Sequence, residues 1–245
     1  MRANYKLHRL FVEASLQERA RVPLDKAQSN YVLNVLRMAD GSDLLVFNGR
    51  HGEWRAKLHK TGKKTAELVC GSLERQQPDA PTLIFCFAPL KAGRLDYMVQ
   101  KAVEMGAGFL QPVLTEFTHN HRLNMDKMRS WVVEAAEQCG VLAVPECLEP
   151  IKLLHLVSAW DEGRALIFCD EDHQTHNPLH LLEQLRNKEL AMLIGPEGGF
   201  SDEERAMLRA KEFVTPIPLG PRILRADTSA VAALAVVQAS IGDWV

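Results

Sequence analysis

The sequence lacks the features that mark membrane, exported or disulfide-stabilised proteins. No apolar run is long enough to span a bilayer, and residues 1–16 mix charged with apolar side chains and contain no signal-peptide core. The five cysteines are scattered and form no C-x-x-C pair, which is typical of reduced thiols in the cytosol. We therefore expect a cytoplasmic protein that folds as one large domain or two small ones.

Several motifs of common active sites are also missing. The chain has neither the G-x-x-x-x-G-K-S/T loop that binds nucleoside triphosphates nor the G-x-G-x-x-G of dinucleotide folds. Ser201 lies outside any G-x-S-x-G hydrolase motif. Acids and histidines gather at residues 170–176, and His119 and His121 lie close together, but no rigid framework for metal ligands is evident. We expect polar loops there and no metal.

The net charge of −2 hides an uneven distribution of charge along the chain. Residues 1–75 carry a net charge of +6, whereas residues 76–245 carry −8. A basic amino-terminal part indicates a polyanionic partner, and a chance imbalance on a solvated surface is the alternative.

Residues 1–75 have the pattern of a small β-barrel. Short strands are expected at residues 10–12, 43–47, 53–58 and 65–69, with Asp-Gly, Asn-Gly and Thr-Gly turns between them. One helix is expected over residues 25–38. Closely spaced short strands predict a barrel, and basic residues on it suit a phosphate backbone. These residues are Arg9, Arg37, Arg50, Arg55, Lys57, Lys60, Lys63 and Lys64.

The composition changes after a plausible linker at residues 73–81. Apolar strands are expected at residues 82–88, 109–114, 165–169, 190–194 and 213–218. Helices are expected at residues 95–105, 125–139, 178–186 and 228–241. This alternation predicts a mostly parallel α/β sheet. The last helix is apolar on most faces, so we expect the sheet or a partner chain to bury it.

Two glycine- and proline-containing loops lie at strand-to-helix junctions of this part. Residues 193–200 (LIGPEGGF) precede a capping box formed by Ser201 and Glu204. Residues 219–225 (LGPRILR) precede the last helix. Because ligands of α/β folds bind beyond the carboxyl ends of the strands, the two loops predict one shared pocket.

Two arginines of the second loop are candidates for chemistry. Arg222 and Arg225 lie among Gly, Pro, Ile and Leu, where a merely solubilising charge is poorly placed. A guanidinium there can stabilise negative charge on a substrate oxygen. The alternative is a structural salt bridge to Asp227 or Glu197.

Together these motifs resemble the RsmE family of 16S ribosomal RNA methyltransferases, in the SPOUT superfamily. The resemblance runs the whole length of the chain and includes residues 9–11 (RLF), 35–37 (VLR), 91–106 and 134–138 (EAAEQ), both loops and the alanine-rich last helix. It implies a PUA-like RNA-binding β-barrel at residues 1–75 and an α/β SPOUT methyltransferase domain with a deep trefoil knot at residues 76–245. It also implies a homodimer, S-adenosylmethionine as cofactor, and methylation of N3 of uridine 1498 in 16S rRNA of the small ribosomal subunit.

The resemblance and the position of the loops together assign the expected site residues. Arg222 and Arg225 would stabilise the deprotonated uridine, and Glu197 would act as a base or an orienting group. The expected cofactor-binding residues are Leu193, Gly195, Pro196, Glu197, Gly198, Leu219, Gly220, Ile223, Leu224, Arg225 and Thr228. The expected RNA-binding residues are Arg9, Arg37, Arg50, Lys91 and Arg94.

The chain departs from the family pattern at two places, and two rival functions stay open. Residues 226–229 are Ala-Asp-Thr-Ser where the family usually has Thr-Glu-Thr-Ala, and residues 30–31 are Asn-Tyr where paired histidines are common. One rival is another SPOUT RNA methyltransferase, acting on a ribose 2′-hydroxyl or a different base. The other is a non-catalytic rRNA-binding assembly factor, against which the intact loops argue.

Overall fold

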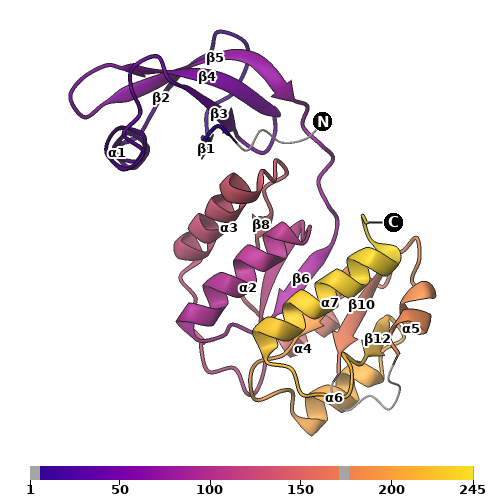
Figure 1. The fold of residues 1–245 in the computed structure, drawn as a ribbon. Helices are drawn as coiled ribbons and strands as arrows, with labels where there is room; N and C mark the ends of the chain where they lie inside the picture. Colours follow the sequence, from indigo (N-terminus) through magenta and orange to yellow (C-terminus); the bar gives the residue numbers. More distant parts are fainter. Residues whose placement is uncertain (1–5, 171–176, 245) are drawn as a thin grey trace. The chain divides into compact units, whose positions relative to one another are not determined.

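The computed structural model describes residues 6–170 and 177–244 (Figure 1). The chain divides into two compact units. Unit 1 comprises Met1–Ala80 and Ala136–Val144, and unit 2 comprises Pro81–Ala135 and Pro145–Val245. Apart from Asp170, the acid- and histidine-rich stretch 170–176 lies outside the described residues. Within the described part, no helix is long and apolar enough to cross a membrane.

Unit 1 is a curled five-stranded sheet with the strand order β1-β3-β4-β5-β2. The strands are β1 (Arg9–Phe11), β2 (Arg21–Pro23), β3 (Asp43–Phe47), β4 (Glu53–Lys60) and β5 (Ala66–Arg75). β1 pairs parallel to β3, and the other pairs are antiparallel. Alternate residues of β5, such as Ala66, Leu68 and Cys70, are buried in an apolar core, as the period of a half-buried strand requires. β5 runs on to Arg75, so the expected linker begins too early, and the three-residue β2 was not predicted.

The expected helix over residues 25–38 begins where predicted but changes its geometry and ends earlier. Asp25 caps α1 (Lys26–Asn30) in a capping box with Gln28. The chain then widens into the π-helical turn η1 (Tyr31–Val35), in which the Leu36 amide donates to the Tyr31 carbonyl. Arg37 follows in a left-handed conformation, at φ 53°. This conformation cannot continue the helix.

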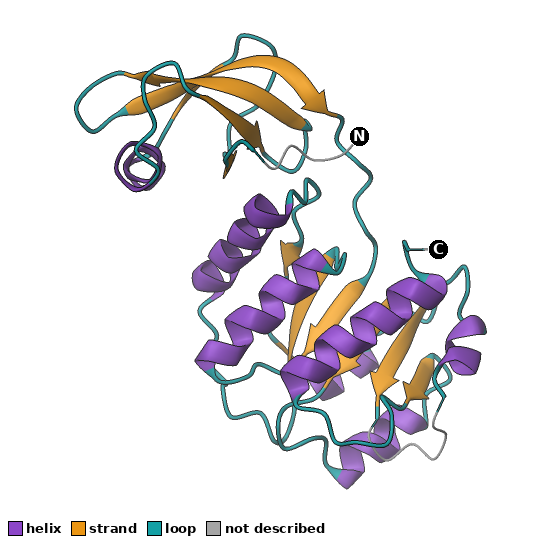
Figure 2. Cartoon of the chain, in the orientation of Figure 1, coloured by secondary structure: helices purple, strands orange, loops and turns teal. Residues whose placement is uncertain are grey.

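Unit 2 is a parallel sheet with the strand order β12-β10-β11-β6-β7-β8, with β9 pairing to the end of β7. Figures 1 and 2 show helices packed around the strands of this sheet. Its strands are β6 (Ile84–Phe87), β7 (Phe109–Leu114), β8 (Glu146–Cys147), β9 (Ile151–Lys152), β10 (Arg164–Cys169), β11 (Glu189–Ile194) and β12 (Val214–Ile217). Every strand pair in this sheet is parallel, as the alternation of strands and helices predicted. Phe85, Phe87 and Phe168 are fully buried in it.

The helices of unit 2 cover this sheet. They are α2 (Ala92–Glu104), α3 (Met125–Cys139, which belongs to unit 1 from Ala136 on), α4 (Leu153–Ser158), α5 (Leu179–Glu183), α6 (Asp202–Arg209) and α7 (Ala226–Ile241). Figure 1 shows α2 and α7 side by side on one face of the sheet. α5 is shorter than the expected helix over residues 178–186, and the short elements β8, β9 and α4 were not predicted. β10, β11 and β12 are neighbours that end at the same edge, where the two glycine-containing loops emerge.

Candidate functional site

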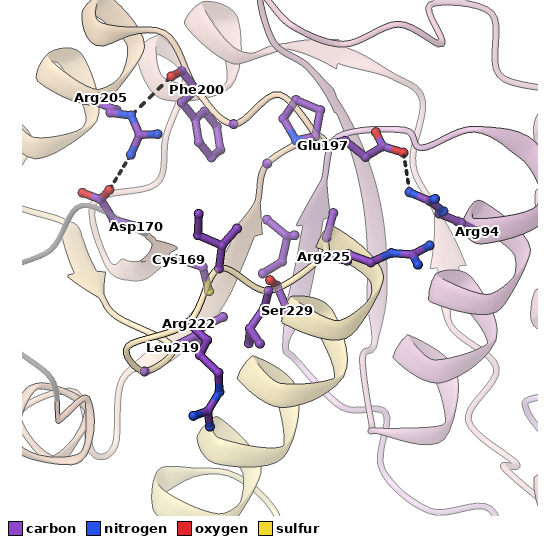
Figure 3. A pocket seen from close by; sticks show the side chains of 18 of the residues that line it. Arg94, Cys169, Asp170, Glu197, Phe200, Arg205, Leu219, Arg222, Arg225 and Ser229 are labelled. Atoms are coloured by element: carbon purple, nitrogen blue, oxygen red, sulfur yellow. Dashed lines mark hydrogen bonds and ion pairs between the residues drawn. The ribbon is translucent and has the colours of Figure 1, made fainter.

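A cavity of about 630 Å³ lies beyond the carboxyl ends of β10, β11 and β12 (Figure 3). Both glycine- and proline-containing loops line it, as the sequence predicted. Its volume is in the range of sites for small organic ligands. The site residues that the sequence predicted and the cavity contains are Gly195, Pro196, Glu197, Leu219, Gly220, Arg222, Ile223, Leu224 and Arg225.

The first loop turns back on itself after β11. The Gly199 amide donates to the Pro196 carbonyl, and Gly199 has a left-handed φ of 69°. The buried ring of Phe200 returns to the start of the loop, where a Cβ on Gly195 would lie 2.5 Å from its Cε2 atom. Phe200 also packs edge-to-face on Phe168, with ring centroids 5.0 Å apart. Because Gly195 has no side chain, its main chain faces both Phe200 and the cavity.

The second loop presents its main chain and two arginines to the cavity. Gly220 has a φ of 94°, and a Cβ there would meet no atom within 4 Å. Ile223 is 91% exposed, which is unusual for an isoleucine. Arg225 is the N-cap residue of α7, in an extended conformation. The loop therefore offers main-chain groups, apolar surface and positive charge to a ligand.

A buried carboxylate anchors the helix that follows the first loop. The side chain of Asp170, at the end of β10, is fully buried. Its Oδ1 atom accepts a hydrogen bond from Arg205 Nη1 at 2.8 Å, and its Oδ2 atom accepts one from Arg209 Nε at 2.8 Å. Arg205 Nε also donates to the Phe200 carbonyl at 3.2 Å (Figure 3). This cluster joins β10, α6 and the end of the first loop.

The charged groups at the mouth of the cavity form loose pairs. Glu197 lies 3.6 Å from Arg94 of α2, so its partner is neither of the loop arginines. Arg225 lies 3.8 Å from Asp227 but keeps 63% of its side chain exposed. For Arg222, which is exposed, no ion pair is found within the described part of the chain. The alternative of a structural salt bridge therefore applies only to Arg225, and its 3.8 Å ion pair with Asp227 leaves the guanidinium accessible.

Three residues that were expected to bind the cofactor do not line the cavity. Leu193 is fully buried inside β11, where its side chain belongs to the core. Thr228 is exposed, and the next residue of α7, Ser229, lines the cavity in its place. A Cβ on Gly198 would lie 3.2 Å from the Cβ of Phe117.

Several lining residues were not assigned to the pocket from the sequence. Arg94 was expected only to contact RNA, and Cys169, Asp170 and Arg205 were not singled out for the pocket. The position of Asp170 directly after an apolar strand was the available signal. Burial raises the pKa of the Cys169 thiol, so this cysteine is protonated at neutral pH and is not a nucleophile.

The basic residues of unit 1 fall into two groups. Arg9 is 8% exposed, and its Nε lies 2.9 Å from Oε1 of the buried Glu53, so the expectation that Arg9 contacts RNA is corrected. Arg55 and Lys57 pair with carboxylates on neighbouring strands. The other basic residues named above for the barrel are exposed and show no ion pair within the described part. They are Arg37, Arg50, Lys60, Lys63 and Lys64.

The Glu53 carboxylate joins two parts of unit 1. It accepts hydrogen bonds from Arg75 and Arg9, and Arg75 also donates to the Gly140 carbonyl. Burial alone would raise the pKa of Glu53, but the hydrogen bonds from Arg75 and Arg9 outweigh it and hold that pKa below 4.5.

Comparison with known proteins agrees with this geometry. Residues 77–238 match a family model described as an RNA methyltransferase domain, and residues 24–69 match an RNA methyltransferase PUA domain. Proteins named ribosomal RNA small subunit methyltransferase E from Synechocystis sp. and Rickettsia conorii are 32% and 26% identical to this chain. The alignments cover 95% of this chain in both cases, and 77% and 96% of those proteins.

Solved structures agree as well. A Legionella pneumophila protein solved with the bound cofactor SAM is 30% identical, with a TM-score of 0.84, over 96% of this chain and 98% of that one. A Neisseria gonorrhoeae ribosomal RNA small subunit methyltransferase E has the same fold, with a TM-score of 0.84 at 24% identity. The predicted PUA-like domain followed by an α/β methyltransferase domain is therefore confirmed. The chain belongs to the ribosomal RNA small subunit methyltransferase E family of RNA methyltransferases.

Proposed function

We propose that this chain methylates N3 of a uridine in 16S rRNA, at position 1498, with S-adenosylmethionine as the methyl donor. The observation that carries the proposal is the cavity at the strand ends, which is lined by the main chain of both loops and bordered by Arg222 and Arg225. The relatives named above support rRNA as the substrate, and the Legionella structure supports the cofactor.

The donor set of the cavity fits the cofactor. Gly195 and Gly220 bring the main chain of both loops to the cavity, and backbone amides and carbonyls match the neutral hydrogen-bonding edge of adenine. Leu219, Ile223 and Leu224 add apolar surface beside these groups. The bound cofactor would supply an electrophilic methyl group on a sulfonium.

The chain's own residues would prepare the acceptor. N3 of uridine is a poor nucleophile until it loses its proton, and the resulting negative charge spreads onto O2 and O4. Arg225 and Arg222 are exposed at the cavity and would stabilise that charge. Glu197 would accept the proton or orient the base, and Arg94, 3.6 Å away, would hold its carboxylate in place.

The remaining parts of the proposal concern RNA and assembly. Residues 1–75 would bind rRNA through the exposed basic residues of unit 1, and residues 76–245 would form the methyltransferase domain with its trefoil knot. We also propose a cytoplasmic homodimer. Support for the dimer comes from α7, where Val231 and Val236 are only half-buried although the helix is apolar on most faces.

A methyl-transfer assay tests the proposal. Labelled S-adenosylmethionine is offered with free 16S rRNA and with assembled small subunits that lack the modification, and the methylated nucleoside is identified. 3-Methyluridine is the expected product. A 2′-O-methylated nucleoside or a different base would point to the rival SPOUT activity. Cofactor binding without transfer to either substrate would support the assembly factor.

A further inference from the structure

An aromatic side chain without a role in the site described above lies beside the first loop. Phe117 follows β7 and is 41% exposed. Its Cβ would be 3.2 Å from a Cβ on Gly198, and its Cγ and Cδ2 would be 3.7 and 3.8 Å away. The side chain of Phe117 therefore lies along the main chain of Gly198, next in sequence to Glu197. Phe117 does not itself line the cavity, but Gly198 lies between the lining residues Glu197 and Gly199, so the ring borders the cavity mouth.

The turn that carries Phe117 is held by its own hydrogen bonds. Thr115 and Thr118, on either side, are 5% and 2% exposed. The Thr115 amide donates to Thr118 Oγ1 at 2.9 Å, the two hydroxyls lie 2.9 Å apart, and the Thr118 amide donates back to the Thr115 carbonyl at 3.2 Å. Two buried threonines thus hold an exposed phenylalanine between them, so the ring is presented by a closed turn.

Two further hydrogen bonds join this turn to the borders of the cavity. The Glu116 amide donates to Glu204 Oε1 at 2.9 Å, and Glu204 forms the capping box of α6 directly after the first loop. Asn120 Nδ2 donates to the Leu90 carbonyl at 3.2 Å, just before α2, which carries Arg94. The position of Phe117 is therefore set relative to the loop with Glu197 and the start of the helix with Arg94.

An exposed ring held beside a charged cavity mouth suits a nucleobase. An enzyme that acts on a base must take it out of its stack, and aromatic side chains replace the lost stacking. Arg94, 42% exposed, and Glu197 add polar groups beside the ring. We infer that Phe117 is the stacking platform for the extruded pyrimidine of the RNA substrate. This inference rests on the proposed function, because it names the residue that receives the target base.

Substitutions at position 117 in the full-length protein test the inference. With assembled small subunits as substrate, Phe117→Ala should raise the KM for RNA about tenfold, while kcat changes less and the affinity for S-adenosylmethionine stays within about twofold. Phe117→Tyr should have a KM for RNA close to that of the wild type. Phe117→Leu keeps apolar surface but has no π face, so its KM should be raised like that of Phe117→Ala. Leu154→Ala is the matched control, because Leu154 is a comparably exposed large apolar side chain, at 63%, on α4.

Each outcome separates this inference from the proposed function. Failure of the wild type to form 3-methyluridine would contradict the proposed function itself. If the wild type is active, an unchanged KM in Phe117→Ala, or full rescue by Phe117→Leu, would overturn the stacking role alone. Loss of an oligomer in Phe117→Ala would also overturn it, because the ring would then be covered by a second copy of the chain.

Discussion

The ring of Phe200 occupies the space that a side chain at position 195 would need, since a Cβ on Gly195 would lie 2.5 Å from Phe200 Cε2. Phe200 cannot move away easily, because it also packs on Phe168 and its carbonyl accepts a hydrogen bond from Arg205. The shape of the first loop therefore depends on the absence of a side chain at one residue.

Gly195→Ala should displace this loop and weaken binding of S-adenosylmethionine by about tenfold or more, given the usual cost of inserting a methyl group into a packed site. Isothermal titration calorimetry with the cofactor measures the change. Gly71→Ala serves as control, because a Cβ on Gly71 would be 3.4 Å from its nearest neighbour, an ordinary contact. Equal affinities for Gly195→Ala and the wild type would show that the loop is not rigid.

Arg205 and Arg209 both bind Asp170, but only Arg205 also reaches the loop, through the Phe200 carbonyl. We expect Arg205→Ala to reduce cofactor affinity several-fold and also to reduce stability. Arg209→Ala should cost a comparable amount of stability, about 1–3 kcal/mol for a hydrogen bond to a buried charge, and leave cofactor affinity nearly unchanged. Urea unfolding and cofactor titration of both variants provide the comparison. Equal losses of affinity would mean that Asp170 positions the site only by holding α6.

The local parts of this site could be predicted from the sequence, and the long-range parts could not. The capping box of Ser201 and Glu204 and the two loops depend on neighbouring residues, so their patterns are visible in the chain. Asp170 meets Arg205 and Arg209 only because β10 and α6 pack together, 35 and 39 positions apart. Phe117 reaches Gly198 through a similar long-range contact.

Arg9, the helix over residues 25–38 and Leu193 differ from what the sequence predicted. Arg9 is a residue type that commonly contacts phosphate, but its guanidinium is buried in an ion pair with Glu53. Because Glu53 is distant in sequence, the residues near position 9 do not indicate this pair. The helix over residues 25–38 has regular apolar spacing, yet its second half adopts wider turns and stops at Leu36. Leu193 belongs to a motif around the site, but burial within β11 takes its side chain to the core.

Arg225 should matter for turnover more than for binding. Arg225→Ala is expected to lower kcat at least a hundredfold, which is typical for the loss of one group that stabilises developing negative charge, and to leave any oligomer intact. Single-turnover methyl transfer and size-exclusion chromatography measure the two effects. Arg186→Ala, which removes an exposed arginine paired with Glu183, is the control. Turnover like that of the wild type would remove Arg225 from the mechanism.

The exposed lysines of unit 1 should govern the electrostatic part of RNA binding. Replacing Lys60, Lys63 and Lys64 by Glu is expected to weaken RNA binding at least tenfold at low salt and to reduce the slope of log K against log salt by about 0.7–0.9 per lost phosphate contact. Cofactor affinity should not change. Filter binding across a salt series gives both values. A triple variant with Lys152→Glu, Lys188→Glu and Lys211→Glu, all exposed in unit 2, controls for net charge. If it has the same effect, general charge would explain the result.

Glu53 should stabilise unit 1 in a pH-dependent way. Its side chain is 1% exposed and receives hydrogen bonds from Arg9 and Arg75, so Glu53→Gln is expected to reduce the free energy of unfolding by about 3 kcal/mol at neutral pH. Because the folded-state pKa of Glu53 is lowered from 4.5, its contribution is complete above pH 4.5 and disappears as the pH falls through that lowered value. The difference in stability between the wild type and Glu53→Gln should therefore shrink in acid. Urea unfolding followed by circular dichroism between pH 7 and pH 3 measures it.

Glu67→Gln, which removes an ion pair to the exposed Arg21, is the control and should cost less than about 1 kcal/mol. A difference for Glu53→Gln that stays constant down to pH 3 would contradict the ionised state assigned to Glu53.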